Sequence, residues 1–234
     1  MAELLYLADC YLKEFEAVVV KAEGNNVELD RTAFYPESGG QPSDKGKLSC
    51  GGQEFSVVKC KKQAGTVLHD LNKPGLKAGD KVKGEIDWQW RYRLMRMHTG
   101  AHIITMAVQS IAPEALVTGG QIGFDESRDD YSLEELTPEL VKKIEEKSNE
   151  IVNAGIEVQI KQLPREEAFK LPQLFKLRDV LPPSIPIIRI IQIAEDMNAC
   201  GGTHVKNTKE VGRITITETK SKGAGNRRIY YKLD

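Results

Sequence analysis

Two short motifs carry residue types that bind transition metals. The segment "MHTGAH" contains His98 and His102, and "MNACGGTHV" contains Cys200 and His204, each pair being four residues apart. On a helix, side chains four residues apart project from one face, so His98 and His102 could bind a single ion. The second pair could bind from a loop. Each pair alone also has an ordinary explanation, as core or surface residues or as a chance spacing.

Taken together, the two pairs hold three of the chain's four histidines and one of its four cysteines. Three imidazoles and one thiolate suit Zn²⁺, which takes nitrogen and sulfur ligands in a tetrahedron. The sequence therefore predicts one zinc ion per chain, bound by His98, His102, Cys200 and His204. His69 falls outside both motifs, in a predicted strand, and we expect it to have a structural or surface role.

A long helix should carry the first pair. From Trp88 to about Ile111 the chain contains no proline and a single glycine, and its apolar residues recur at helical spacing. A second helix is predicted between Thr137, which suits the N-cap, and Gly155, which follows the last turn. Pro138 in the first turn supports this assignment, because proline fits the first helical position.

The segments around these helices read as β structure. Several short apolar stretches before residue 88, separated by glycine, lysine and Pro-Gly, favour a small barrel. After the second helix we expect four more strands, the last two forming a hairpin, and one short helix, without regular βαβ alternation. We therefore predict an α+β fold, with a small β-barrel domain over residues 1–89 and a zinc-containing α+β domain over residues 90–234.

Composition limits the partners and the compartment. The chain has 234 residues, with 33 Lys and Arg against 34 Asp and Glu, so any nucleic acid must be bound by a local basic patch. The four cysteines show no spacing typical of a secreted scaffold, which indicates a reducing, cytosolic setting. We find no signal peptide and no apolar run of about eighteen residues, and we expect a cytoplasmic protein without a membrane span.

The motifs resemble those of one known family. "HTGAH" and "CGGTH" are similar to the H-x-x-x-H and C-x-x-x-H zinc motifs of alanyl-tRNA synthetase editing domains and of their freestanding relatives, the AlaX proteins. "FYPESGGQPSDKG" resembles the glycine-rich signature of the barrel that precedes this editing domain. "GFDESRDDYSL", "LPREEA" and "SKGAGNRRIYYKL" also resemble family segments, in the same order. The length and the barrel look like the medium-sized AlaX class.

The resemblance implies trans-editing, in which a freestanding protein hydrolyses the aminoacyl ester of mischarged tRNA(Ala). Ser-tRNA(Ala) is the first candidate substrate and Gly-tRNA(Ala) the second, because fit alone cannot exclude glycine or strongly reject serine from an alanine pocket. Zinc could polarise the ester carbonyl or lower the pKa of a water toward ~7. Four protein ligands, however, are typical of a structural zinc site, whereas catalytic zinc keeps one position open.

The resemblance also implies roles for residues outside the zinc motifs. Thr118 lies where the family carries a threonine associated with serine recognition, although a strand threonine is an equal alternative. Gly201 and Gly202 could let substrate approach the metal loop, or simply allow a tight turn. We recognise no general base, and the terminal ribose hydroxyl of the tRNA could assist proton transfer.

Candidate tRNA contacts fall in two places. Gly39, Gly40 and Gln41 of the glycine-rich segment could meet the acceptor end, pack against the second domain, or form only a turn. Basic residues with nearby aromatics could bind phosphates, or could form a solvated charged face. These basic candidates are Arg91, Arg93, Arg96, Lys220, Lys222, Arg227 and Arg228.

Three alternatives remain open. The first is editing of a different mischarged tRNA, as in threonyl-tRNA synthetase editing domains, although the "FYPESGGQ" barrel signature argues against it. The second is a zinc-stabilised tRNA-binding module without hydrolysis. The third is a fragment of a synthetase. Since the chain begins with Met and has no room for an aminoacylation domain, we expect a freestanding protein without ligase activity and without an obligate protein partner.

Overall fold

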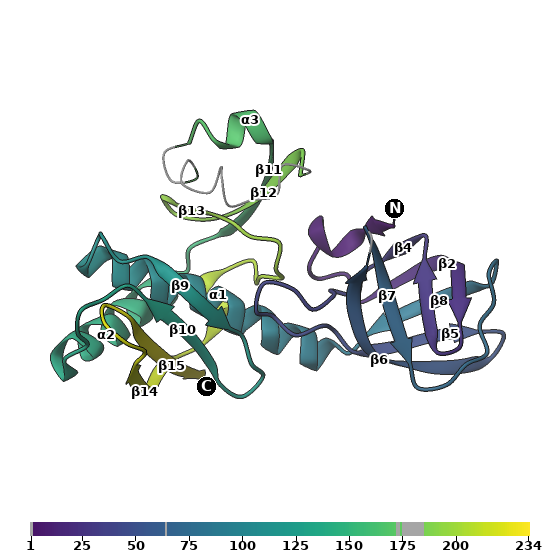
Figure 1. Ribbon diagram of the computed structural model, residues 1–234, viewed down its shortest axis with the longest axis horizontal. Coiled ribbons are helices and arrows are strands. Elements are labelled where there is room, and N and C mark those ends of the chain that lie inside the picture. The colour runs from purple at the N-terminus through teal and green to yellow at the C-terminus, as the bar shows by residue number, and fades with distance from the viewer. Residues whose placement is uncertain (1, 64, 172–173, 175–184) are drawn as a thin grey trace.

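The computed structural model describes residues 2–63, 65–171, 174 and 185–234. A β-barrel lies at one end of the molecule and an α+β part at the other, and α1 (Trp88–Ile111) connects them (Figure 1). The N-terminus lies beside the barrel and the C-terminus ends β15 (Arg227–Leu233) in the α+β part. The predicted α+β class with an N-terminal barrel is confirmed.

The barrel is closed by strands in the order β2-β3-β7-β6-β5-β8. Its strands alternate between buried and exposed residues, most clearly in β8, so that apolar side chains fill the interior. The sequence did not indicate β5, which pairs with both β6 and β8. The bounds are β2 Glu14–Glu23, β3 Asn26–Leu29, β5 Gly46–Cys50, β6 Gln53–Gln63, β7 Thr66–Leu71 and β8 Lys81–Ile86.

His69 of β7 is fully buried inside this barrel. One ring nitrogen lies 2.9 Å from the hydroxyl of Thr32 and the other lies 3.0 Å from the carbonyl oxygen of Val27. Burial lowers the pKa of His69 to about 4, so the ring is neutral. Of the two roles expected for this histidine, the structural one is confirmed and the surface one is wrong.

The two predicted helices form at the expected residues. In α1 the carboxylate of Asp87 caps the N-terminus by accepting a hydrogen bond from the backbone N–H of Trp90. The second helix, α2 (Pro138–Ala154), is capped by Thr137 and ends at Gly155, whose φ of 66° lies in the left-handed region. One face of α1 and one stripe of α2 share a single apolar core.

Two sheets complete the α+β part. The first has the order β14-β15-β10-β9 and includes the predicted hairpin, and the second has the order β11-β12-β13. The second sheet and the short helix α3 (Arg165–Ala168) stand apart from the first sheet in Figure 1. The bounds are β9 Val117–Gln121, β10 Ser127–Tyr131, β11 Val158–Pro164, β12 Ile187–Ile193, β13 Asp196–Ala199 and β14 Ile214–Ser221; two-residue strands β1 (Glu3–Leu4) and β4 (Arg31–Thr32) pair beside the barrel.

A buried ion pair joins the barrel to α1. Arg91 in the first turn of α1 is completely buried, and its guanidinium binds both carboxylate oxygens of Asp44. The same guanidinium donates to the carbonyl oxygens of Cys10 and Ala33. The prediction that Arg91 contacts a tRNA phosphate is therefore wrong, because the guanidinium is completely buried and donates to oxygen atoms inside the protein.

We predict that Arg91→Leu lowers the free energy of unfolding by about 3–5 kcal/mol, because Asp44 would be left buried without its partner. Urea unfolding would measure the loss. Arg31, which lies 3.7 Å from Glu3 and is about half exposed, provides the matched control, and its replacement by Leu should change stability by less than ~1 kcal/mol. Equal, small effects at both positions would show that the buried pair does not hold the parts together.

Candidate metal centre

The four predicted ligands converge on one point. The ligand atoms of His98, His102, Cys200 and His204 all lie within 4.8 Å of one another, and they form a group that could hold a metal ion. The Sγ atom of Cys200 lies 3.5 Å from Nε2 of His98 and 3.3 Å from Nε2 of His204. Tetrahedral zinc, with Zn–N of about 2.0–2.1 Å and Zn–S of about 2.3 Å, requires N–S edges of about 3.5 Å. The donor set and these edges fit zinc.

Two parts of the chain supply the ligands. His98 and His102 project from one face of α1, as their spacing predicts. Cys200 follows β13, and its N–H donates to the carbonyl oxygen of Arg189 in β12. The guanidinium of Arg189 in turn donates to the carbonyl oxygens of Cys200 and Gly202, so it fixes the loop that carries the second pair.

The charge state of the imidazoles also suits metal binding. Burial lowers the pKa of His98 and of His204 well below the usual range, and it lowers that of His102 to about 4. The rings are therefore neutral at pH 7 and offer a lone pair. Burial raises the pKa of the Cys200 thiol, so a bound cation would have to displace its proton.

Hydrogen bonds set which nitrogen of His98 and His204 faces the centre. Oε1 of Gln41 accepts from the backbone N–H of Thr203, which identifies that atom as the oxygen, and it lies 2.7 Å from Nδ1 of His98. His98 must then donate from Nδ1, which leaves Nε2 free to bind an ion. The hydroxyl of Thr99 donates to Met95 and accepts from Nδ1 of His204, with the same result.

Gln41 thus supports the centre from the glycine-rich segment. It is buried, and its Nε2 donates to the hydroxyl of Thr203. Of the alternatives for the glycine-rich segment, Gln41 packs against Thr203 and His98 of the α+β part, and its buried side chain does not reach the surface for a tRNA contact. Gly40 packs on β9, where an added Cβ would lie 2.7 Å from the carbonyl oxygen of Gly120. Gly39 is exposed and lines the adjoining hollow.

That hollow, of about 470 Å³, opens beside the centre. Thr118 lines it, and its hydroxyl donates to Oδ1 of Asn226 at the tip of the β14–β15 hairpin. The structure therefore brings Thr118 and three of the predicted ligands, His98, His102 and Cys200, to one space. The lining residues are Gly39, His98, Ala101, His102, Thr105, Val117, Thr118, Gly119, Gly120, Ile122, Asp129, Asn198, Ala199 and Cys200.

Sequence reasoning missed Asp129, which lines the same hollow. Only 5% of Asp129 is exposed, and among the residues that the structure describes none donates a hydrogen bond to its Oδ2. Burial and the neighbouring Asp130 raise its pKa to about 7, against a smaller lowering by Arg128. The sequence carried one signal for it. Asp129 and Asp130 are adjacent in a strand before Tyr131, and because successive strand residues face opposite sides, one of the two carboxylates had to point inward.

The predicted basic residues lie at two places around the α+β part. Lys220, Lys222, Arg227 and Arg228 sit on the β14–β15 hairpin, whose tip contacts Thr118. Lys220 and Lys222 are exposed, whereas Arg227 binds carbonyl oxygens of its own turn and Arg228 forms an ion pair with Asp130. Arg93 of α1 donates to the carbonyl oxygen of Leu233, and Arg96 donates to that of Val211.

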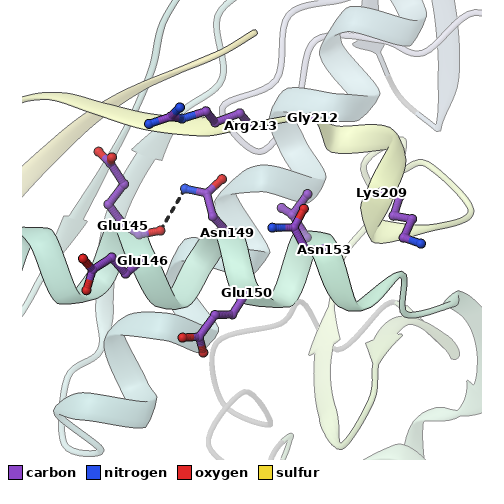
Figure 2. Close-up of a pocket in the computed structure, with 9 residues that line it drawn as sticks. Glu145, Glu146, Asn149, Glu150, Asn153, Lys209, Gly212 and Arg213 are labelled. Carbon is purple, nitrogen blue, oxygen red and sulfur yellow. Dashed lines mark hydrogen bonds between the residues drawn. The ribbon is translucent and has the colours of Figure 1, made fainter.

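A second and more voluminous hollow, of about 790 Å³, is separate from the centre. Figure 2 shows it between α2 and the segment that leads into β14, with Glu145 and Asn149 on one side and Arg213 on the other. The amide of Asn149 donates to the carbonyl oxygens of Glu145 and Ile214. None of the predicted ligands lines this hollow, and its contacts dock β14 on α2.

The two glycines of the metal loop differ in their surroundings. A Cβ on Gly202 would lie 2.2 Å from Cε1 and 2.3 Å from Nδ1 of His98, and 3.0 Å from Oε1 of Gln41. A Cβ on Gly201 would meet no heavy atom within 4 Å. Gly202 therefore gives room to a ligand ring, and Gly201 is exposed at the surface.

We predict that Gly202→Ala weakens zinc binding by about 10- to 100-fold, the range expected when the support of a ligand is disturbed. The added methyl group must displace the His98 ring or its bond to Gln41. Competition with a chromophoric chelator would measure the affinity. Gly201→Ala is the matched control and should bind zinc as the unmodified chain does. Equal affinities in the two variants would contradict the role of Gly202 in giving room to the His98 ring.

Within the described part of the chain, no helix has the length and apolar character needed to cross a membrane.

Two family models match the sequence. Residues 188–230 match the second additional domain of threonyl and alanyl tRNA synthetases, and residues 3–90 match class II (A) tRNA synthetases. The first match includes the Cys200 and His204 pair, and the second covers the barrel.

Curated relatives match the whole chain. An alanyl-tRNA editing protein AlaX-M of Saccharolobus solfataricus is 46% identical over all of this chain and 99% of its own length, and one of Methanosarcina mazei is 46% identical over all of this chain and 97% of its own. An alanine–tRNA ligase of Metallosphaera sedula is 38% identical over 98% of this chain, which corresponds to 26% of the ligase. The chain therefore belongs to the AlaX-M family of alanyl-tRNA editing proteins.

Proposed function

We propose that this chain is an aminoacyl-tRNA deacylase that hydrolyses the ester of mischarged tRNA(Ala), with Ser-tRNA(Ala) as the main substrate and Gly-tRNA(Ala) as the second. The observation that carries this proposal is the group of His98, His102, Cys200 and His204 at one side of a hollow that Thr118 also lines. Family membership supports it, since the AlaX-M relatives are named alanyl-tRNA editing proteins.

Zn²⁺ is the proposed ion, one per chain, and when bound it would supply electrophilic assistance to the ester carbonyl or to an attacking water. The chain's own residues position the ligand atoms. His98 and His204 are held by Gln41 and Thr99 with Nε2 toward the centre. Arg189 holds the loop of Cys200. These contacts keep the ligand atoms in place before substrate arrives, so little reorganisation is needed during the reaction.

Thr118 is the proposed determinant for serine. Its hydroxyl lines the hollow and is held by Asn226, so one lone pair is available to accept from a seryl hydroxyl. An alanyl ester cannot donate this hydrogen bond, so it binds with less free energy than a seryl ester, by about one hydrogen bond. Gly39 and Gly201 are the proposed points where substrate passes close to backbone, while Gly202 acts by giving room to His98.

The tRNA would approach over the β14–β15 hairpin. Lys222 and Lys220 are exposed there, and Asn226 links the hairpin tip to Thr118 in the hollow. A phosphate backbone beside these cations would bring its acceptor end to the hollow. Arg93, Arg96, Arg227 and Arg228 could contribute charge although their guanidinium groups also serve internal contacts, and Gly40 would act through its packing on β9.

We propose two domains, residues 1–89 and 90–234, because the buried apolar clusters divide there: one contains barrel residues from Phe15 to Ile86 and the other begins in α1 at Leu94, with Cys10 as its one earlier member. A cytoplasmic location is proposed from the four free cysteines.

The second candidate function is a tRNA-binding module with a structural ion, which the four-ligand set favours.

One assay separates these functions. We predict hydrolysis of Ser-tRNA(Ala), slower hydrolysis of Gly-tRNA(Ala), and little hydrolysis of Ala-tRNA(Ala) or Ser-tRNA(Thr). Cys200→Ala should lose zinc and lower kcat/KM for Ser-tRNA(Ala) more than about 100-fold, beyond the usual effect of removing a supporting residue. Release of free serine and metal content are measured on the same samples, before and after treatment with a chelator.

Thr118→Val, measured with the same substrates, should reduce the preference for serine over alanine by about 10-fold, the value of one hydrogen bond. Its zinc content should not change, because Thr118 is not a ligand.

For the four-substrate assay, binding of tRNA(Ala) without release of serine would support the structural-ion module. Full activity in zinc-free Cys200→Ala would contradict the metal's role.

A further inference from the structure

An unpaired carboxylate lines the hollow beside the metal ligands. Asp129 is 5% exposed, and no described residue donates a hydrogen bond to its buried Oδ2. Burying an ionised carboxylate without a partner is costly, and proteins retain such groups where a ligand or a reaction uses them. Asp129 therefore needs a function that the packing of the chain alone does not provide.

The strands direct this carboxylate toward the hollow. Asp129 and Asp130 are neighbours in β10, so their side chains face opposite sides. Asp130 is bound by Arg228 on the outer side, and only Asp129 lines the hollow. Across the ladder, Asp129 is paired with Gly120, where a Cβ would lie 2.6 Å from Oδ1 of Asp129. A glycine at this position leaves the carboxylate uncovered.

The charges around the hollow identify the missing partner as a cation. Among the described residues that line the hollow, Asp129 carries the only carboxylate, and the two imidazoles belong to the metal ligands His98 and His102. The nearest arginine in sequence, Arg128, instead lies against Asp130 and Gln121. A cation that enters with the substrate would complete the site.

We propose that the carboxylate of Asp129 binds the α-ammonium group of the aminoacyl ester. The inference rests on the proposed deacylase function and names how the reacting amino acid is oriented. An aminoacyl ester carries its ammonium group on the carbon next to the carbonyl. An anchor for this group, with the carbonyl turned toward the metal ligands, would hold the ester in one orientation and would exclude acyl groups that lack an amine.

The energetics of the Asp129 carboxyl group agree with this role. Burial raises the pKa of Asp129 to about 7, so the carboxyl is poorly stabilised as an anion. An ammonium group within hydrogen-bond distance favours the ionised form and restores the charge pair. The ligand thus gains a charge-assisted hydrogen bond at a position where the protein has prepared no internal one.

The test removes the ammonium group from the substrate and the carboxylate from the protein, separately and together. Deamination of Ser-tRNA(Ala) with nitrous acid replaces the amine with a hydroxyl. For the unmodified chain, kcat/KM should fall by about 30- to 100-fold, after correction for the spontaneous hydrolysis rates of the two esters. In Asp129→Asn and Asp129→Leu the same substrate change should cost less than about fivefold.

Asp130→Asn is the matched control, because it removes the adjacent carboxylate on the outer side of the same strand. It should retain the full dependence on the ammonium group, whatever its effect on the overall rate. If the unmodified chain hydrolyses Ser-tRNA(Ala) but both Asp129 variants keep the 30- to 100-fold dependence, the inference is overturned while the proposed function stands. No hydrolysis by the unmodified chain would instead overturn the proposed function.

Thermal unfolding checks that the variants fold and that Asp129 is buried as a charge. A folded-state pKa of about 7, above the usual 3.8, means that the folded protein keeps a proton that the unfolded chain releases between about pH 4 and pH 7. Stability conferred by the protonated form is therefore lost as pH rises through this window. Asp129→Asn should raise Tm at pH 8 more than at pH 4, and the same shift at both pH values would contradict the burial of this charge.

Discussion

The orientation of two imidazole rings by hydrogen bonds at Nδ1 is the interaction on which the metal centre depends. Oε1 of Gln41 holds His98, and the hydroxyl of Thr99 holds His204, so that Nε2 of each ring faces Sγ of Cys200. A histidine with the other tautomer would present an N–H group to the ion and could not bind it. The donor atoms are therefore set by residues that never touch the ion.

One of these supports comes from the barrel, which gives the N-terminal part a direct role in the chemistry. The segment of Gly40 and Gln41 passes over β9 and reaches the loop of Thr203, while Arg91 and Asp44 fix the barrel to the start of α1. The barrel and the metal-binding part thus share one site at their junction. A displacement of the barrel would move Oε1 of Gln41, which lies 2.7 Å from Nδ1 of His98, and would therefore disturb the orientation of the His98 ring.

Local signals in the sequence account for much of the fold. Helix α1 occupies Trp88–Ile111 as its apolar period and lack of proline indicate, and α2 begins and ends at the predicted caps, Thr137 and Gly155. The four ligands could be named because their residue types are rare in this chain and their spacing is regular. Long-range partners gave no such signal. Gln41 and His98 form a hydrogen bond although they are 57 residues apart in the sequence.

The same limit explains the errors among the site residues. Arg91 looks like its neighbours Arg93 and Arg96 in the sequence, and only the fold brings Asp44 to it. Strand alternation implies that Asp129 and Asp130 face opposite sides, but not which side is the hollow. The difference depends on how β10 pairs with β9 and β15, which is a property of the assembled sheet.

X-ray absorption at the zinc K-edge on the purified, zinc-loaded protein tests most directly whether one ion joins the two motifs. We predict one sulfur at about 2.3 Å and three nitrogens at about 2.0–2.1 Å around each zinc. A coordination sphere without sulfur, or one made only of oxygen ligands, would contradict a centre formed by His98, His102, Cys200 and His204.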